Sequence, residues 1–170
     1  ALRAQATESY TVDGQNVVPA VHEVLGRIAT FSAALRGSSD SAPSHVGSTG
    51  KAITQVVAIG IGGSYLGPEF VHEALRTDAT SKAAAAGRTL HFLANVDPTD
   101  VLRALEGFDP ETTLAVVISK TFTTAETMMN AATVKSWLID SIQKKHPEVT
   151  AVSIAAQHIV ACSANVKGAE

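Results

Sequence analysis

Short apolar runs alternate with helical stretches after about residue 51, and this alternation limits the folds that the chain can adopt. Each run is brief, rich in Val, Ile and Leu, and bounded by turn residues, so it is predicted to be a strand. Strands separated by helices are typical of a parallel sheet with helices on both faces. We therefore expect an α/β fold with a doubly wound parallel sheet. The predicted strands are residues 55–60, 89–93, 113–118 and 158–162.

Two parts of the chain differ in pattern. Residues 1–50 are expected to form an N-terminal segment, with a helix over 19–35 and then a loop rich in Ser and Gly. Residues 51–170 carry the alternation and are expected to form the main domain. Asp97 is expected to cap one of its helices. The helices predicted there are 66–77, 98–106 and 124–145, with 79–87 and 149–156 compatible with further helical turns.

Composition excludes several classes of function. The net charge is −3 and no basic stripe is present, so a nucleic-acid partner is not expected. No apolar run approaches the ~18 residues of a membrane span, and the start at Ala1 shows no secretory signal. The single cysteine, Cys162, lies in an apolar run and is expected to be a packing residue in a reducing compartment. No histidines have metal-ligand spacing, so neither a metal nor a cofactor is expected.

A glycine-rich turn follows the first predicted strand, with Gly62, Gly63 and Ser64 at its centre. Such a turn lets backbone N–H groups approach an anion at the start of a helix. Tyr65 stands where the dinucleotide fingerprint needs a third glycine, and Pro68 stands where a P-loop needs Lys. The turn therefore predicts a phosphate site of another kind, or a tight strand-to-helix turn without a ligand.

A second cluster, of hydroxyl groups and one ammonium group, follows the third predicted strand. These groups, together with backbone N–H groups, donate hydrogen bonds to phosphate oxygens. Thr123 and Glu126 have the spacing of a capping box, which accounts for those two residues only. We predict that this cluster and the glycine turn converge on one phosphorylated small molecule. The cluster consists of Ser119, Lys120, Thr121, Phe122, Thr123 and Thr124.

Other polar residues are weaker candidates. His91 and His158 lie on predicted strands and are expected to be buried and neutral. Asn95 and Asp97 follow a strand end, as do residues 163–165, and turn or capping roles are as compatible with them as a place in the ligand crevice.

Several stretches taken together resemble the glucose-6-phosphate isomerase family. Residues 56–68 are similar to its glycine-rich signature, and residues 119–127 resemble its second signature. Tyr65 and Ala125 depart from the residues that many members carry, and loop 38–48 departs from the expected aromatic-rich form. Shorter similar stretches lie at 13–19, 50–53, 95–98 and 158–165, so the resemblance spans almost the whole chain.

The resemblance implies a sugar isomerase (SIS) fold, a parallel sheet between helices that binds phosphosugars. It implies an aldose–ketose isomerase that interconverts glucose 6-phosphate and fructose 6-phosphate in glycolysis and gluconeogenesis. The complete enzyme would be a cytoplasmic homodimer, with a plastid location still open. By matching position, the residues implied to bind the substrate and its phosphate are Gly63, Ser64, Ser119, Lys120, Thr121, Phe122, Thr123 and Thr124.

The resemblance also implies that this chain is part of a larger enzyme. The family's catalytic Glu base, its ring-opening His and Lys, and an assisting Arg belong to motifs in the later half of such enzymes. Glu69, Glu73 and Glu126 match none of these motifs. The chain is therefore expected to contribute a binding half-site and no catalytic residue.

Three alternatives remain at this stage. The chain could be a phosphosugar-sensing SIS module of a regulator or an aminosugar-forming enzyme, although such a module would lack the paired signatures. It could be a nucleotide-binding oxidoreductase domain, which Tyr65 disfavours. It could also be a purely structural fragment whose crevice binds nothing.

Overall fold

The computed structural model describes residues 1–37 and 44–169. The chain divides into two compact units, residues 1–45 and 46–170. The N-terminal segment expected from the sequence ended slightly later, because residues 46–50 here belong to the second unit. Six residues of the expected Ser- and Gly-rich loop, 38–43, lie outside the described residues.

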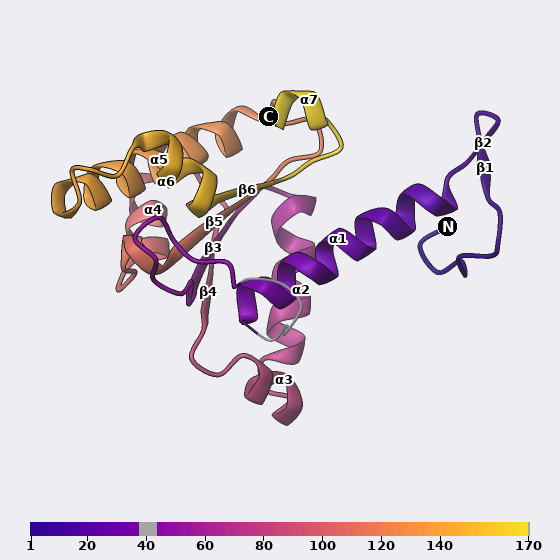
Figure 1. Ribbon diagram of the computed structural model, residues 1–170, viewed down its shortest axis with the longest axis horizontal. Helices are drawn as coiled ribbons and strands as arrows, with labels where there is room; N and C mark the ends of the chain where they lie inside the picture. The colour runs from indigo at the N-terminus through magenta and orange to yellow at the C-terminus, as the bar shows by residue number, and fades with distance from the viewer. Residues whose placement is uncertain (38–43, 170) are drawn as a thin grey trace. The chain divides into compact units, whose positions relative to one another are not determined.

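The first unit consists of a small hairpin and one helix (Figure 1). β1 (Thr11–Val12) pairs antiparallel with β2 (Gln15–Asn16) around an Asp-Gly turn, in which both residues have positive φ. The sequence analysis did not predict this hairpin. α1 (Val18–Arg36) ends at Gly37, which adopts the left-handed conformation common after helices. The expected helix over residues 19–35 is thus confirmed.

The second unit is built on a four-stranded sheet in which every neighbouring pair is parallel (Figure 1). Its strands are β3 (Gln55–Ile59), β4 (Thr89–Leu93), β5 (Thr113–Ile118) and β6 (Ile159–Cys162). Their spatial order is β4-β3-β5-β6. All four predicted strands are therefore confirmed, each to within one residue at its ends.

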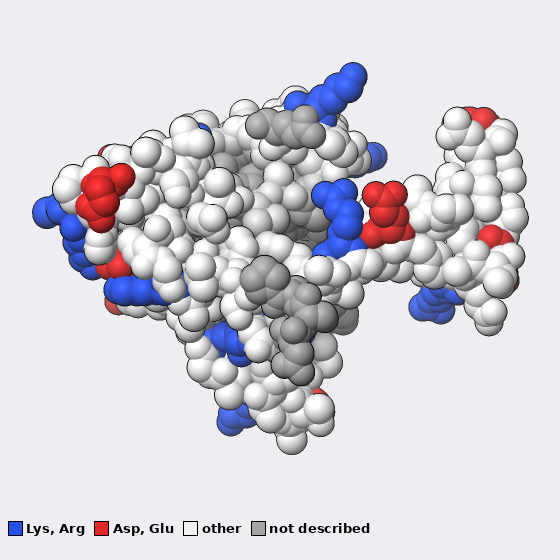
Figure 2. Space-filling view, in the orientation of Figure 1, with Lys and Arg blue, Asp and Glu red and all other residues white. Residues whose placement is uncertain are grey.

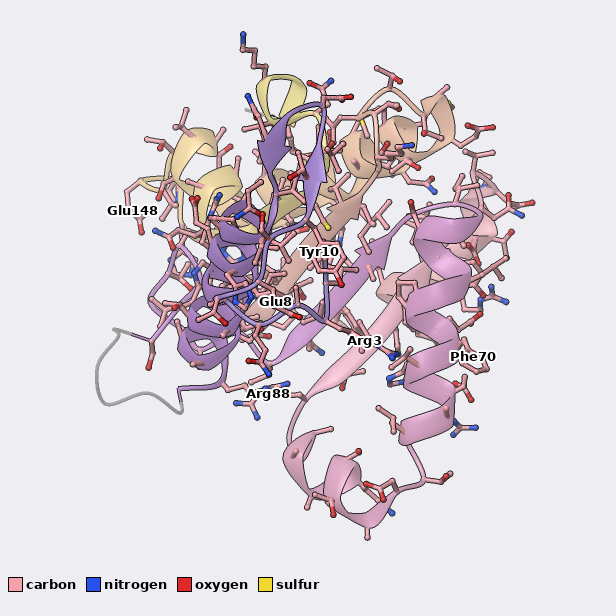
Figure 3. The ribbon with its side chains drawn as sticks, turned by 90° about the vertical axis from the view of Figure 1, so that its right-hand side faces the viewer. Arg3, Glu8, Tyr10, Phe70, Arg88 and Glu148 are labelled. Carbon is pink, nitrogen blue, oxygen red and sulfur yellow. The ribbon has the colours of Figure 1, made fainter. Side chains whose placement is uncertain are left out.

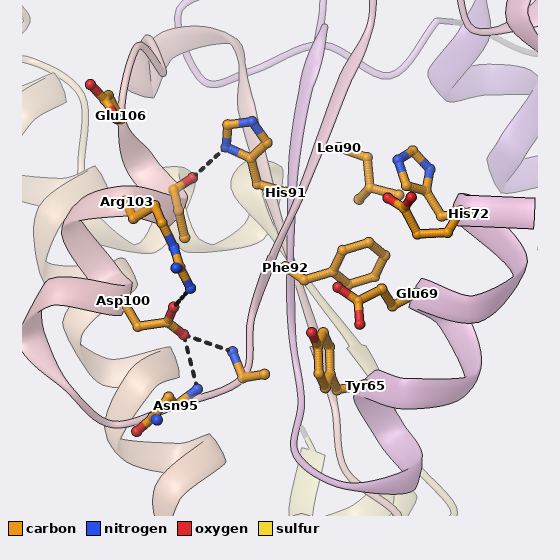
Figure 4. Close-up of a pocket in the computed structure, with 13 residues that line it drawn as sticks. Tyr65, Glu69, His72, Leu90, His91, Phe92, Asn95, Asp100, Arg103 and Glu106 are labelled. Carbon is orange, nitrogen blue, oxygen red and sulfur yellow. Dashed lines mark hydrogen bonds and ion pairs between the residues drawn. The ribbon is translucent and has the colours of Figure 1, made fainter. Parts of the chain in front are cut away.

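Helices fill the connections between these strands. They are α2 (Gly63–Leu75), α3 (Ala79–Ala84), α4 (Pro98–Leu105), α5 (Ala125–Lys145), α6 (Ala151–His158) and α7 (Val166–Ala169), with a 3₁₀ turn η1 (Pro110–Thr112) before β5. α2 and α4 lie on opposite sides of β4 (Figure 4), so the sheet has helices on both faces, as predicted. No helix in the described residues has the length and apolarity that crossing a membrane requires.

Two helices differ from their predicted bounds. α2 begins at Gly63, three residues early, because the glycine turn itself forms the first helical turn. The Gly62 carbonyl accepts the N–H groups of both Tyr65 and Leu66, at 3.0 and 2.8 Å. The Ala-rich stretch after α2 is a separate helix, α3, which Asp78 caps by accepting the Ser81 N–H at 2.8 Å.

The core lies between the sheet and α5. The strands contribute fully buried residues such as Val57 and Leu114, and α5 contributes one buried residue per turn on a single face. Full burial of each such side chain stabilises the fold by roughly 2 kcal/mol. Helix α5 therefore anchors the sheet from one side. Its buried apolar residues are Val134, Leu138 and Ile142.

α2 differs from α5 because none of its residues is buried. Phe70 is 73% exposed and points away from the sheet (Figure 3). Leu66 and Val71 on the same helix are also exposed. An uncovered apolar face of this kind is typical of surfaces that pack against other protein.

Two residues lie where the sequence analysis did not expect them. Cys162 was predicted to pack in the core but is exposed, because it ends β6 at the border of the sheet. His158 is buried as predicted, but it is the last residue of α6 and not a strand residue. Its Nδ1 donates to the Thr113 carbonyl at 2.7 Å, and its Nε2 accepts the Ser48 N–H at 2.8 Å. This bonding fits the expected neutral ring.

A buried carboxylate holds the amino edge of the sheet together. Glu111, just before β5, is 3% exposed. Its oxygens lie 2.9 Å from Lys51 Nζ, before β3, and 3.3 Å from both Lys145 Nζ and His146 Nε2, at the end of α5. Thr49 donates a further bond at 3.1 Å. The hydrogen bond from Lys51 is the main cause that lowers the pKa of Glu111 from 4.5 to about 2.

We predict that Glu111 makes the second unit acid-sensitive. The lowered pKa adds stability that is complete above about pH 4.5 and is lost as the pH falls toward 2. Glu111→Gln should lower the free energy of unfolding at pH 7 by about 2 kcal/mol and should flatten its decline below pH 4.5. Urea unfolding followed across pH 2–7 measures both effects. Glu106→Gln, at an exposed carboxylate, is the control, and an equal loss in both variants would contradict the prediction.

Gly60 allows α2 to start directly beside the end of β3. A Cβ built on Gly60 would lie 2.8 Å from the Ser64 carbonyl oxygen, which is backbone and cannot rotate away. Gly67, further along α2, has nothing within 4 Å of such a Cβ. The two glycines therefore offer a matched pair for testing this close approach.

We predict opposite effects of the same substitution at these two sites. Gly60→Ala should destabilise the unit by about 2 kcal/mol, because the turn must shift. Gly67→Ala should stabilise it by about 1 kcal/mol, because alanine is the better helix former. Thermal unfolding of both variants tests this, and a neutral Gly60→Ala would show that the turn adapts freely.

Candidate functional site

The sheet order brings the two predicted phosphate-binding turns to one place. β3 and β5 are adjacent and parallel, in a register that pairs Ile59 with Val117. The chain leaves β3 toward β4 on one side and leaves β5 toward β6 on the other. Such a point, where successive connections diverge, opens a crevice beyond the carboxyl ends of the strands, and ligands of α/β sheets bind there. Both turns begin at this crevice.

The glycine turn exposes N–H groups at the start of α2. Gly62 has φ 56° and ψ −124°, a conformation that is open to glycine but costly for other residues. The N–H groups of Gly62 and Gly63 donate to no acceptor in the part of the chain that the structure describes. Ser64 is the second residue of α2 and is partly exposed. These groups are therefore available to an anion.

The hydroxyl cluster is organised around Ser119, which is only 2% exposed. Its Oγ accepts the Phe122 N–H at 3.1 Å and lies 3.3 Å from Thr124 Oγ1. Phe122 has a φ of 56°, which is unusual for a residue with a side chain. Thr123 donates to Thr121 Oγ1 at 2.8 Å, and both are exposed. Ser119 therefore holds the loop from inside, and the two threonines face outward.

The predicted capping box is absent. Thr124, and not Thr123, is the N-cap of α5, and no side chain caps this helix. The Thr124 hydroxyl lies beside Ser119 Oγ instead. α4 differs, because Asp97 caps it as predicted and accepts the Thr99 N–H at 2.8 Å. The first N–H groups of α5 are thus left without a side-chain acceptor, at the end of the helix that favours negative charge.

Lys120 adds positive charge to this surface. Its side chain belongs to an exposed residue, and none of the ion pairs among the described residues involves it. In Figure 2, basic and acidic side chains lie in small mixed groups on the visible face. A lysine beside uncapped helical N–H groups is a favourable arrangement for binding phosphate.

Residues 163–165, which the sequence analysis left between a turn and the crevice, contact the hydroxyl cluster. Ser163 Oγ and the Ala164 N–H both donate to the Lys120 carbonyl, at 3.1 Å. Asn165 Nδ2 donates to the Thr121 carbonyl at 2.9 Å. The carbonyls of this loop are thereby occupied. A pairing signal for these residues was not visible in the sequence, because the contact spans more than forty positions.

A third loop, after β4, is held by hydrogen bonds of its own. Asp100 accepts the N–H groups of Ala94 and Asn95, at 3.3 and 3.1 Å. The buried Asn130 of α5 donates to the Asn95 carbonyl at 2.9 Å. Asn95 and Asp97 thus serve a turn and a cap in this structure.

A separate cavity of about 890 Å³ lies along the edge strand β4, between α2 and α4 (Figure 4). Glu69, Glu73, Asp100 and Glu106 line it, against a single arginine, Arg103, which is paired with Asp100. This acidic lining opposes the binding of a phosphate dianion. None of the predicted phosphate-binding residues lines this cavity. No group of metal-ligating side chains occurs among the residues described.

Comparisons with known proteins agree with this fold and site. The family model for phosphoglucose isomerase matches residues 1–170. The chain is 52% identical over 167 residues to "Glucose-6-phosphate isomerase, cytosolic B" of Oryza sativa subsp. japonica, and 50% identical over 166 residues to the cytosolic enzyme of Arabidopsis thaliana. Each match covers 98% of this chain and 27% of the relative.

A solved structure is also similar. The crystal structure of a glucose-6-phosphate isomerase from Chlamydia trachomatis superposes with a TM-score of 0.62 at 26% identity, over 91% of this chain and 25% of that one. The chain thus spans about a quarter of the length of the proteins that it matches. The match of the family model over residues 1–170 shows that the chain belongs to the phosphoglucose isomerase family.

Proposed function

We propose that this chain is the sugar-phosphate-binding part of a glucose-6-phosphate isomerase, an enzyme that interconverts glucose 6-phosphate and fructose 6-phosphate. The observation that carries the proposal is the position of two N–H-rich turns, side by side at the divergence of β3 and β5. Backbone N–H groups at two helix starts suit a phosphate group better than a neutral ligand. Residues 51–170 form the phosphosugar domain in this proposal.

The proposed contacts follow from what each group has free. Gly63 and Ser64 contact the substrate from the start of α2. Lys120, Thr121 and the uncapped start of α5 bind the phosphate. The others position the loop or add N–H and hydroxyl donors, with Ser119 acting from its buried place. These remaining residues are Ser119, Phe122, Thr123 and Thr124.

The chemical step needs groups that this chain does not offer. Isomerisation moves a proton between C1 and C2 and requires a free base beside the substrate. Of the carboxylates considered from the sequence, Glu73 is ion-paired with Arg76, and a hydrogen bond to Glu69 raises the pKa of the Tyr65 hydroxyl. Glu126 lies in the first turn of α5. We therefore propose that the catalytic base belongs to another part of a longer protein.

The assembly and location are proposed from the relatives. Two of them are named as cytosolic enzymes, which supports a cytosolic location for this protein. The resemblance to the family supports a homodimer. The exposed apolar face of α2 is compatible with packing against further protein.

We predict that the 170-residue chain binds fructose 6-phosphate and that the hydroxyl cluster carries this binding. Ser119→Ala combined with Thr121→Ala should weaken the affinity about tenfold, because a loop-holding bond and a ligand donor are both lost. Isothermal calorimetry measures the change.

The control for this double variant is Thr133→Ala with Ser136→Ala, two exposed hydroxyl residues of α5 away from the loop. NAD is titrated in parallel. Unchanged affinity in the double variant would remove the cluster from the site. Binding of NAD alone would favour an oxidoreductase domain, and no binding of either ligand would favour a structural fragment.

We also predict that the 170-residue chain does not isomerise the sugar phosphate that it binds. A coupled assay of fructose 6-phosphate conversion should give a rate equal to the buffer blank, because no base is placed beside the substrate. Turnover near that of a complete glucose-6-phosphate isomerase from a relative would overturn the assignment of catalysis to another part of the protein.

A further inference from the structure

The hydroxyl cluster is held in place by a segment distant in the sequence. Residues 163–165 follow β6, whereas the cluster follows β5, and these two strands are neighbours. The Ser119 N–H donates to the Cys162 carbonyl at 3.1 Å, which extends the strand pairing to the base of the loop. Beyond this point, every printed contact from residues 163–165 to the loop is made to a loop carbonyl.

Peptide geometry converts these carbonyl contacts into an orientation of the N–H groups. In a trans peptide unit the C=O and N–H groups point in opposite directions. Ser163 and Ala164 hold the Lys120 carbonyl. The N–H of the same peptide unit, that of Thr121, therefore points away from residues 163–165. It donates to no acceptor within residues 1–37 and 44–169.

The next peptide unit follows the same logic. Asn165 Nδ2 holds the Thr121 carbonyl at 2.9 Å. The N–H of that unit belongs to Phe122 and points to the opposite side, where Ser119 Oγ accepts it at 3.1 Å. The two bonds fix this peptide from both ends and maintain the left-handed φ of 56° at Phe122. Without one of them, this costly conformation would lose part of its support.

Asn165 is itself fixed in place. Its N–H donates to Ser163 Oγ at 3.0 Å, and its Oδ1 accepts the Gly168 N–H at 3.1 Å. A Cβ at Gly168 would overlap the Asn165 amide nitrogen, so α7 packs closely on this side chain. The Asn165 amide is thus held with its N–H₂ group toward the loop and its oxygen toward α7.

We propose that Ser163 and Asn165 are positioning residues of the phosphate site: they bind the carbonyls of Lys120 and Thr121, and so turn the N–H of Thr121 toward the ligand. This inference rests on the proposed function. It deepens that function, because it names the residues that give the loop its ability to donate. Neither residue needs to touch the sugar phosphate.

The first test concerns the loop without a ligand. Asn165→Asp keeps the size and the oxygen that accepts from Gly168, but it removes the donor to Thr121. Amide hydrogen exchange of Phe122, followed by NMR on the 170-residue chain, should become at least tenfold faster. Gly168→Ala, which displaces the Asn165 amide, should have the same effect. Val166→Ala, at an exposed residue of α7, should leave the exchange unchanged.

The second test concerns anion binding. The affinity of the chain for inorganic phosphate and for fructose 6-phosphate should fall about tenfold in Asn165→Asp and in Ser163→Ala. Ser163→Thr keeps the hydroxyl and should restore affinity. The midpoint of thermal unfolding is measured alongside, and we expect little change, because residues 163–165 lie outside the core.

The outcomes separate this inference from the proposed function. Faster exchange at Phe122 in a chain that binds no phosphate would support the positioning role and overturn the proposed function. Unchanged exchange at Phe122 in both Asn165→Asp and Gly168→Ala would overturn the positioning role, even if the chain binds phosphate. Loss of affinity that follows the thermal midpoint in every variant, Val166→Ala included, would also overturn it.

Discussion

The parallel pairing of β3 with β5 is the constraint on which the rest of the second unit depends. It is the central pairing of the sheet, and its register brings the ends of both strands to the same level. Two loops that are nearly sixty residues apart in the chain therefore start side by side. Each outer strand then supports the loop beside it: the Leu93 carbonyl accepts the Gly60 N–H, and the Cys162 carbonyl accepts the Ser119 N–H. The sheet thus continues its hydrogen bonding into the base of both loops.

Above that base, the loops differ from the sheet in how they use their backbone groups. In the sheet, carbonyl and N–H groups are consumed together. In the loop after β5, the carbonyls of Lys120 and Thr121 have partners while several N–H groups do not. In the turn after β3, the Gly62 carbonyl serves the first turn of α2 while its N–H is left over. An imbalance of this kind is costly for an exposed surface only if no acceptor arrives, since water satisfies the groups until an anion replaces it.

The sequence predicted the strands well because their pattern is local: short apolar runs between turn residues are recognisable wherever they lie. It predicted the two binding turns for the same reason. It failed where a partner is distant. Thr124 becomes the N-cap of α5 because Ser119 occupies its hydroxyl, and no spacing rule describes that competition. Cys162 is exposed because β6 is at the border of the sheet, which strand order decides and an apolar run does not. The roles of Ser163 and Asn165 depend on the same strand order.

The two edges of the sheet divide stability from binding. At the amino edge, Glu111 gathers Lys51 from before β3 and Lys145 from the end of α5, so three elements are joined around one buried charge that is already neutralised. Nothing there is left for a ligand. At the carboxyl edge, Lys120 is exposed and the N–H groups are unoccupied. A phosphate bound there would complete the second edge much as Glu111 completes the first, with an anion at the centre and cationic and N–H donors around it. The fold therefore does not require the ligand, and the ligand finds donors that the fold has already oriented.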